Sequence, residues 1–188
     1  AYGCDISDEA AVETMFRETG SIDILVNNAR IDPYKRSAGM RDGEWWDAVM
    51  AVNLKGAYLC GKLALEQMKT KRWGRMVHIS SIWAYQPPNE RMLSYAAAKS
   101  AMHALSRGFA ALGAPYGVTS NVLAPGLILT DLCTERLTPE MMQRELDTIP
   151  LRRGAPPGEV AEAVFDLAKS GFLTGEVVNL NGGAFMRP

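Results

Sequence analysis

Two side chains one helical turn apart could carry out proton transfer. Tyr95 and Lys99 are the first and last residues of YAAAK, and positions i and i+4 share one face of a helix. A phenol ordinarily has a pKa of about 10, too high for a base at neutral pH, and a neighbouring ammonium group lowers it. The pair could therefore exchange a proton with an alcohol or carbonyl oxygen.

A serine hydroxyl could hold the same oxygen. Ser80 and Ser81 end the apolar run RMVHISS, and a hydroxyl at a strand end can act as one donor of an oxyanion hole. Successive strand side chains face opposite sides, so only one of the two serines can face the tyrosine. YAAAK alone is a weak signal that also fits an ordinary amphipathic helix start. Its position between a strand ending in ISS and a strand ending in NVLAPG strengthens the catalytic interpretation.

Strand-like and helix-like segments alternate along the chain and must position these residues. Strands are expected at 1–5 (the end of one), 22–27, 75–81, 118–124 and 176–180. Helices are expected at 8–18 (capped by Ser7), 42–71 (capped by Asp42), 94–114, 139–149 and 158–169. This alternation predicts βαβ units and a parallel sheet covered on both faces, an α/β fold. Since ligands bind at the carboxyl ends of such strands, functional residues should follow Asp5, Asn27, Ser81 and Ala124.

Composition limits the function classes. A chain of 188 residues, 47% apolar and 22% charged, predicts one domain over 1–188. Its 20 basic and 21 acidic residues give no basic excess for nucleic acid or a membrane surface. No apolar run is expected to span a membrane, and AYGCDISD does not resemble a signal peptide. The basic run Lys69, Lys71, Arg72 and Arg75 is expected to form a solvated face.

The cysteines and histidines predict neither disulfides nor a metal site. Three cysteines, Cys4, Cys60 and Cys133, are far apart and form no CxxC pair. We expect reduced thiols in a cytoplasmic protein. His78 and His103 lack metal-ligand spacing, so both are expected to be structural.

Six motifs, in order, resemble those of the short-chain dehydrogenase/reductase family, close to its 3-oxoacyl-carrier-protein reductase type. They are CDISD at 4–8, Asn27-Asn28-Ala29, VNLKG around Asn53, Ser81 with Tyr95 and Lys99, Pro125-Gly126 with Thr130, and Asn181-Gly182-Gly183. The resemblance runs essentially from end to end. It implies a Rossmann-like doubly wound parallel sheet in three α/β/α layers, and an NAD(P)-dependent oxidoreductase that interconverts a secondary alcohol and a ketone.

The resemblance also implies residue roles. Tyr95 would be the acid/base, Ser81 (preferred to Ser80 for its spacing) would hold the substrate oxygen, Lys99 would lower the tyrosine pKa and bind the nicotinamide ribose, and Asn53 would hold a water of a proton relay. The residues expected to bind NAD or NADP are Asp5, Ile6, Asn27, Asn28, Ala29, Tyr95, Lys99, Pro125, Gly126, Ile128 and Thr130.

The sequence departs from the family pattern in three places. The phosphate-binding TGxxxGxG loop, with the N-terminal βαβα portion, is expected upstream of Ala1, which would leave strand 22–27 as an unpaired edge unless another subunit pairs with it. Arg30 replaces the glycine of NNAG. It lacks glycine's freedom at positive φ, so it either reshapes the turn or places a cation near the cofactor; harmless variation is the expected outcome. Residues 167–173 are expected to be shortened.

Assembly and substrate access are also implied by the family. A homotetramer or homodimer is expected, with helices 42–71 and 94–114 at the interfaces. Residues 131–150 correspond to a mobile lid, so Leu132, Leu137, Met141 and Met142 could line an apolar site for a small alcohol or ketone. The alternative is a non-enzymatic fragment or pseudoenzyme that keeps the fold as a binding or assembly module.

Overall fold

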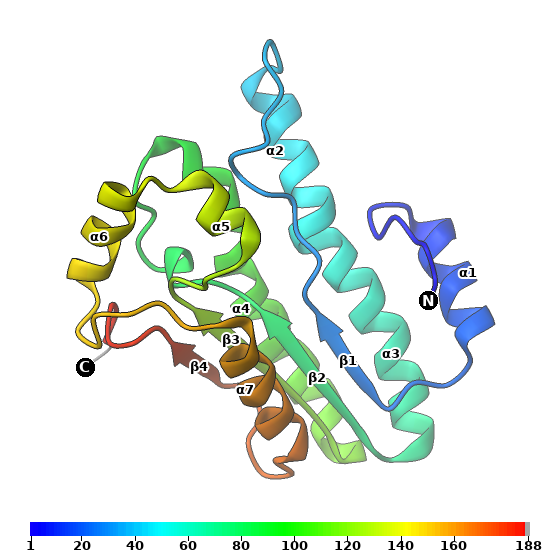
Figure 1. Ribbon diagram of the computed structural model, residues 1–188. Coiled ribbons are helices and arrows are strands. Elements are labelled where there is room, and N and C mark those ends of the chain that lie inside the picture. Colours follow the sequence, from blue (N-terminus) through cyan, green and yellow to red (C-terminus); the bar gives the residue numbers. More distant parts are fainter. Residues whose placement is uncertain (187–188) are drawn as a thin grey trace.

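Four parallel strands form a single sheet in a computed structural model that describes residues 1–186 (Figure 1). The strands are β1 (Ile24–Asn27), β2 (Gly74–Ile79), β3 (Val118–Pro125) and β4 (Val177–Leu180), paired in the order β1-β2-β3-β4. The register sets Val26 opposite Val77 and Leu123 opposite Val178. The predicted α/β fold with a parallel sheet is confirmed.

Helices connect the strands and cover both faces of the sheet. The α-helices are α1 (Glu9–Thr19), α2 (Asp42–Met50), α3 (Ala57–Lys71), α4 (Leu93–Gly113), α5 (Asp131–Arg136), α6 (Pro139–Thr148) and α7 (Pro157–Lys169). The shorter elements are the π-helix η1 (Ala51–Gly56) and the 3-10 turns η2 (Ile82–Ala84), η3 (Glu90–Met92) and η4 (Ala114–Tyr116). In Figure 1, α7 lies on the opposite side of the sheet from α3 and α4.

Alternating side chains of β2 divide the core into two apolar layers. Met76 packs with Leu65 and Phe109 of α3 and α4, whereas its neighbour Val77 packs with Leu167 of α7. This is the twofold alternation of a strand buried on both faces. It produces the expected three-layer α/β/α arrangement.

The first strand of the sheet is an edge, as predicted. β1 is hydrogen-bonded to β2 on one side only, and Ile24 and Val26 are 47% and 42% exposed. The expectation that residues 1–5 end a strand is wrong for this structure, in which they form no regular element. A strand needs a hydrogen-bonding neighbour, and no described strand lies beside this segment.

The two predicted helix caps are each displaced by one residue. Asp8, not Ser7, caps α1, and its Oδ1 accepts hydrogen bonds from the backbone N–H groups of Ala10 (2.9 Å) and Ala11 (3.3 Å). Asp42 is the first residue of α2, and the N-cap is Arg41, whose N–H donates to the Glu44 carboxylate at 3.0 Å. Both sites still place acidic groups in the first turn, where the helix dipole favours them.

The predicted helix over 42–71 is one continuous helical unit with a π-helical turn in its middle. α2, η1 and α3 follow one another without a break, and the unit Asp42–Lys71 is long and apolar enough to cross a membrane. This differs from the expectation that no run approaches a membrane span. Half of its most apolar window is buried within the fold, so its apolar residues are explained by core packing.

Arg75 is not part of a solvated basic face. It lies in β2 and is 7% exposed, and its Nη1 donates to the carbonyl oxygens of Gly74 (2.8 Å) and Gly117 (3.1 Å). Its guanidinium carbon lies 4.5 Å from the Trp73 ring centroid. A charged side chain is tolerated in such a place when carbonyl groups and an aromatic face replace its water.

A close contact between α3 and α4 leads to a stability prediction. A Cβ atom at Gly61 would lie 2.5 Å from Cε2 of Phe109, which is buried. Gly61→Ala should therefore lower the free energy of unfolding by about 1–3 kcal/mol. Gly108→Ala is the matched control, because nothing lies within 4 Å of its Cβ position, and it should be neutral or stabilise by about 0.5–1 kcal/mol. Urea unfolding measures both, and equal midpoints for the two variants would contradict the packing argument.

Candidate active site

The carboxyl ends of the strands bring most of the predicted site residues to one edge of the sheet. β1 ends at Asn27, β2 ends just before Ser80, and β3 ends at Pro125. α5 and α6 lie beyond the same edge (Figure 1). The clustering expected after Asn27, Ser81 and Ala124 is found, whereas Asp5 lies in the loop before α1, outside the sheet.

Tyr95 and Lys99 come from the first turns of α4 and share one buried space. They are 6% and 1% exposed. Lys99 Nζ donates to the carbonyl oxygen of Ile79, at the end of β2, at 2.6 Å. The same Nζ lies 5.7 Å from the Tyr95 ring centroid. The helical spacing thus places the two groups together, as the sequence predicted.

The adjacent serines at the end of β2 have different partners. The Ser81 hydroxyl lowers the pKa of the Tyr95 phenol and accepts a hydrogen bond from the N–H of Trp83 at 3.2 Å. Ser80 is buried; its hydroxyl donates to the carbonyl oxygen of Lys99 at 3.1 Å and lies 2.8 Å from His103 Nε2. The structure therefore directs Ser81, and not Ser80, at the tyrosine.

The pKa values of Tyr95 and Lys99 are shifted differently from what their spacing in the sequence predicted. Burial raises the pKa of Tyr95, and this effect outweighs the lowering by the Arg30 charge and the Ser81 hydrogen bond. Burial also lowers the pKa of Lys99 to about 7, with a further contribution from Arg30. The expected net lowering of the Tyr95 pKa is thus not found. The cation that acts on the phenol is Arg30, because desolvation removes much of the charge on Lys99 at neutral pH.

Asn53 is completely buried in the π-helix η1. Its Oδ1 accepts a hydrogen bond from the N–H of Ile31 at 2.7 Å, which fixes the loop after β1. Its Nδ2 has no hydrogen-bond partner in the described part of the chain. An unpaired buried donor is costly, and π-helical turns are frequent at functional sites. Nothing in the periodicity of residues 42–71 indicates this turn.

The remaining predicted cofactor residues fall into two groups. In the first, Asn27 is buried, and its Nδ2 donates to the Ala57 carbonyl at 3.2 Å and contacts His78 Nδ1 at 3.0 Å. Asn28 and Ala29 are exposed just beyond β1. Asp5 accepts from the Ser7 hydroxyl at 2.8 Å, and Ile6 packs on the apolar core.

The second group follows β3. Gly126 donates its N–H to Leu180 at 2.9 Å, and a Cβ atom at Gly126 would lie 2.9 Å from Cβ of Asn181. Ile128 forms a bridge with Ala155, and Thr130 caps α5 by accepting from the Cys133 N–H. Only glycine fits so close to the segment at Asn181 of the same chain. This explains why glycine follows Pro125.

His78 has a structural environment, as predicted. It is fully buried, its Nε2 lies 3.1 Å from the Ser120 hydroxyl, and its ring stacks on Phe109. Burial lowers its pKa to about 4, with a further contribution from Lys99, so the imidazole is neutral at pH 7. Among residues 1–186, no group of three or more His, Cys, Asp or Glu could hold a metal ion.

Sequence reasoning missed a charged cluster beside the tyrosine. Asp32 is 7% exposed, is paired with Arg136 of α5, and has Nη1 of Arg30 3.8 Å from its Oδ1. Burial would raise the pKa of the Asp32 carboxyl, but the N–H of Tyr34 and the two arginines outweigh it and hold this pKa below its ordinary value. Arg30 is not at positive φ, so its replacement of glycine does not strain the turn. The unusual Arg30 was a visible signal, but Asp32 and Arg136 gave none.

A family model described as Enoyl-(Acyl carrier protein) reductase matches residues 1–184. The 3-oxoacyl-[acyl-carrier-protein] reductase FabG of Haemophilus influenzae is 36% identical over 188 residues, covering 97% of this chain and 76% of that protein. The chain belongs to the short-chain dehydrogenase/reductase family. The Aquifex aeolicus reductase of the same name is 37% identical over 177 residues, covering 93% of this chain and 70% of that protein.

The fold comparison agrees with this assignment. The crystal structure of a putative gluconate dehydrogenase from Agrobacterium tumefaciens superposes with a TM-score of 0.86 at 27% identity, covering 96% of this chain and 73% of that one. This short-chain dehydrogenase/reductase is therefore an oxidoreductase with a Rossmann-like fold, and NAD or NADP is the cofactor of its family.

The site residues of the short-chain dehydrogenase/reductase fit the nicotinamide ribose end of such a cofactor. Buried Lys99 uses one N–H on the Ile79 carbonyl, and an ammonium group carries three donors. The remaining donors suit the hydroxyls of a ribose. The unpaired Asn53 Nδ2 offers a further buried donor close to this edge of the sheet.

Proposed function

We propose that the enzyme interconverts a secondary alcohol and a ketone by hydride transfer with NAD or NADP, using Ser81, Tyr95 and Lys99 as its catalytic centre. The single observation that carries this proposal is the convergence of the three side chains at the carboxyl edge of the sheet. The Ser81 hydroxyl acts on the Tyr95 phenol and lowers its pKa, and Lys99 Nζ lies 5.7 Å from the tyrosine ring centroid.

The proton chemistry is assigned to Tyr95 and Ser81. A bound nicotinamide cofactor supplies or accepts the hydride. During reduction, the Tyr95 hydroxyl donates its proton to the substrate oxygen as that oxygen gains negative charge, and the Ser81 hydroxyl donates a hydrogen bond to the same oxygen. The raised pKa keeps the phenol protonated before reaction, the form that reduction requires. In the oxidation direction, the phenolate takes the proton back.

Lys99 and Asn53 are assigned to supporting roles. Lys99 would bind the ribose hydroxyls, and its protonated fraction would join Arg30 in stabilising the phenolate that remains after proton donation. Asn53 Nδ2, buried and without a partner in the described chain, would hold a water that returns a proton to Lys99 from solvent. Buried polar groups without a protein partner are the groups that ordered buried waters commonly satisfy.

The remaining cofactor contacts are proposed at the two loops that follow β1 and β3 and at the segment before α1. They are Asp5, Ile6, Asn27, Asn28, Ala29, Pro125, Gly126, Ile128 and Thr130. α5 and α6 would cover the substrate. The apolar side chains proposed to face it are Leu132, Leu137 and Met142, which are half-buried, and Met141, which is exposed. Trp83, whose ring lies edge-on to Tyr95 at 6.2 Å, would form one wall.

The test is cofactor binding followed by turnover. The chain is produced together with any residues that its gene encodes upstream of Ala1, and NADH or NADPH is titrated while its fluorescence is followed. We expect saturable binding, and oxidation of the bound cofactor by at least one member of a panel of small and acyl-like ketones. A folded protein that binds neither cofactor and reduces no ketone would instead favour the non-enzymatic binding or assembly module.

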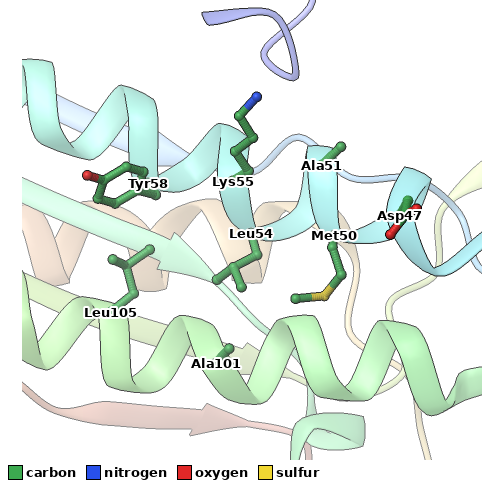
Figure 2. Close-up of a pocket in the computed structure, with 8 residues that line it drawn as sticks. All are labelled: Asp47, Met50, Ala51, Leu54, Lys55, Tyr58, Ala101 and Leu105. Carbon is green, nitrogen blue, oxygen red and sulfur yellow. The ribbon is translucent and has the colours of Figure 1, made fainter.

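The apolar groove in Figure 2 is separate from the catalytic centre and supports a proposal about assembly. It has a volume of about 650 Å³, and Met50 and Leu54 point from the helical unit 42–71 toward α4 (Figure 2). Its lining residues are Asp47, Met50, Ala51, Leu54, Lys55, Tyr58, Ala101 and Leu105. We propose that a second copy of the chain packs on this face to give a homodimer or homotetramer. A monomeric molar mass from light scattering at micromolar concentration would contradict this.

The remaining assignments concern location and ligand class. The three cysteines are free, which fits a reducing cytoplasm, and we expect the enzyme to act there. We expect a small-molecule alcohol or ketone as its ligand, rather than nucleic acid or a membrane.

A further inference from the structure

Three arginines cluster around the loop that follows β1, where the charge of Arg30 acts on Tyr95. This group, called the arginine cluster below, consists of Arg30, Arg91 and Arg136, with the carboxylate of Asp32 and the ring of Tyr34 between them. We propose that Arg30, supported by Arg136, binds a carboxylate of the substrate, so that the preferred substrates are hydroxy acids and the corresponding oxo acids. This inference rests on the proposed oxidoreductase function and specifies its substrate class.

Asp32 neutralises Arg136 and leaves the charge of Arg30 largely free. The Asp32 carboxylate is hydrogen-bonded to Arg136 through Oδ2 and accepts the Tyr34 N–H at 3.0 Å through Oδ1. Arg30 Nη1 is 3.8 Å from that Oδ1, beyond the distance of a hydrogen bond. One buried carboxylate thus holds one arginine firmly and the other only loosely. The Arg30 guanidinium keeps its donors for a ligand, and its side chain is 39% exposed.

The other arginines add to the positive potential. The guanidinium carbons of Arg136 and Arg91 lie 4.2 and 6.0 Å from the Tyr34 ring centroid. Three arginines and one carboxylate leave a net charge of about +2 on a cluster that joins the loop after β1, helix α5 and the 3-10 turn η3. A patch of one sign beside a partly enclosed site raises the local concentration of ligands of opposite charge.

Arg30 lies near the proposed catalytic residues, because the N–H of its neighbour Ile31 donates to the buried Asn53 Oδ1 at 2.7 Å. The charge of Arg30 acts on both Tyr95 and Lys99. Within the described chain, Asp32 is the one ion-pair partner of Arg30. A guanidinium group matches a carboxylate through two parallel N–H donors. A carboxylate bound to Arg30 would therefore lie near the Tyr95 phenol. In an oxo acid the carboxylate is likewise near the carbonyl carbon that reacts.

A phosphate of the cofactor is the other source of negative charge that an arginine could bind. The two sources predict different kinetics. Loss of a substrate carboxylate site changes the discrimination between an acid and its ester, whereas loss of a phosphate site raises the KM for the cofactor and leaves that discrimination unchanged.

The experiment compares α- and β-oxo acids with their methyl esters in the wild type and in Arg30→Gln. It uses the chain with any residues encoded upstream of Ala1. The readout is the ratio of kcat/KM for acid and ester, because any change in the field at Tyr95 affects both substrates alike. We expect the wild type to favour at least one acid by about 10- to 100-fold, the range of one charge-assisted hydrogen-bonded pair. Arg30→Gln should bring the ratio close to 1, mainly through the KM of the acid, and Arg30→Lys should restore part of it.

Arg36→Gln is the matched control. Arg36 lies in the same loop but is paired with exposed Asp42 and donates to the Met40 carbonyl, so its loss should leave the ratio unchanged. A wild-type ratio near 1 for every pair would overturn the inference while leaving the oxidoreductase function in place. So would a ratio that survives Arg30→Gln, or an effect confined to the cofactor KM. If the wild type reduces neither acids nor esters, the proposed function fails and the inference fails with it.

Discussion

Tyr95→Phe should lower kcat for ketone reduction by about 10²- to 10⁴-fold, the usual contribution of a positioned general acid. The substitution removes only the hydroxyl on which Ser81 acts and keeps the buried ring, which lies edge-on to Trp83. Steady-state rates with saturating NADH or NADPH measure the effect. Cofactor affinity should fall far less than kcat, because Lys99 and the other proposed cofactor contacts remain.

Tyr85→Phe is the control for Tyr95→Phe. Tyr85 belongs to the same loop region, and its ring stacks on Phe185 at 4.6 Å between centroids, a contact that phenylalanine preserves. The turnover of Tyr85→Phe should stay within about twofold of the wild type, because the ring contacts with Phe185 and His103 are kept. Comparable rates for wild type and Tyr95→Phe across the ketone panel would remove Tyr95 from the mechanism.

Lys99→Met should raise the stability of the cofactor-free protein at low pH and abolish most of its activity. Burial lowers the pKa of Lys99 to about 7 from an ordinary 10.5. Between these values the unfolded chain holds a proton that the folded chain has lost, so the free energy of unfolding rises with pH across this window. Below pH 7 both states are protonated, and the folded state carries the full cost of the buried charge. At about 1.4 kcal/mol per pH unit, the cost is about 5 kcal/mol.

The measurement is urea unfolding of the cofactor-free wild type and Lys99→Met at about pH 6 and about pH 9. The variant should be more stable than the wild type at the lower pH, and the difference should shrink as the pH rises, because the wild type loses its buried charge. Lys62→Met, at an exposed position of α3, should show no such pH-dependent difference. A pH-independent gap between wild type and Lys99→Met would mean that Lys99 does not titrate in this window. Full activity of Lys99→Met would argue against its place in the catalytic centre.

The residues proposed to serve catalysis at this site destabilise the cofactor-free protein. A buried lysine with one carbonyl partner and an asparagine with an unpaired buried amide are both costly in a protein without its ligand. Binding of the cofactor would supply partners for these groups and recover part of that free energy. Substitutions that relieve the cost in the free protein are therefore expected to remove activity.

The amino-acid sequence by itself determined the parts that depend on local periodicity. The apolar runs at 22–27, 75–81, 118–124 and 176–180 and the helical segments between them were enough to predict a parallel α/β sheet, and the structure confirms it. The spacing of Tyr95 and Lys99 was enough to put them on one helix face, because four residues make about one helical turn. The parallel topology then brings Asn27, Ser81 and Pro125 to one edge, since all four strands run in the same direction.

Only the tertiary structure decided what depends on burial and on contacts between distant segments. The pairing of Asp32 with Arg136 joins residues 104 positions apart, and no periodicity in the sequence encodes such a contact. Arg75, placed on a solvated face by its sequence neighbours, is buried because β2 lies inside the sheet. Lys99 is a weaker cation than its residue type implies, and Arg30 acts on the phenol instead, because desolvation and Coulomb interactions depend on distances in space and on exclusion of water. Residue types and their spacing along the chain set neither of these quantities.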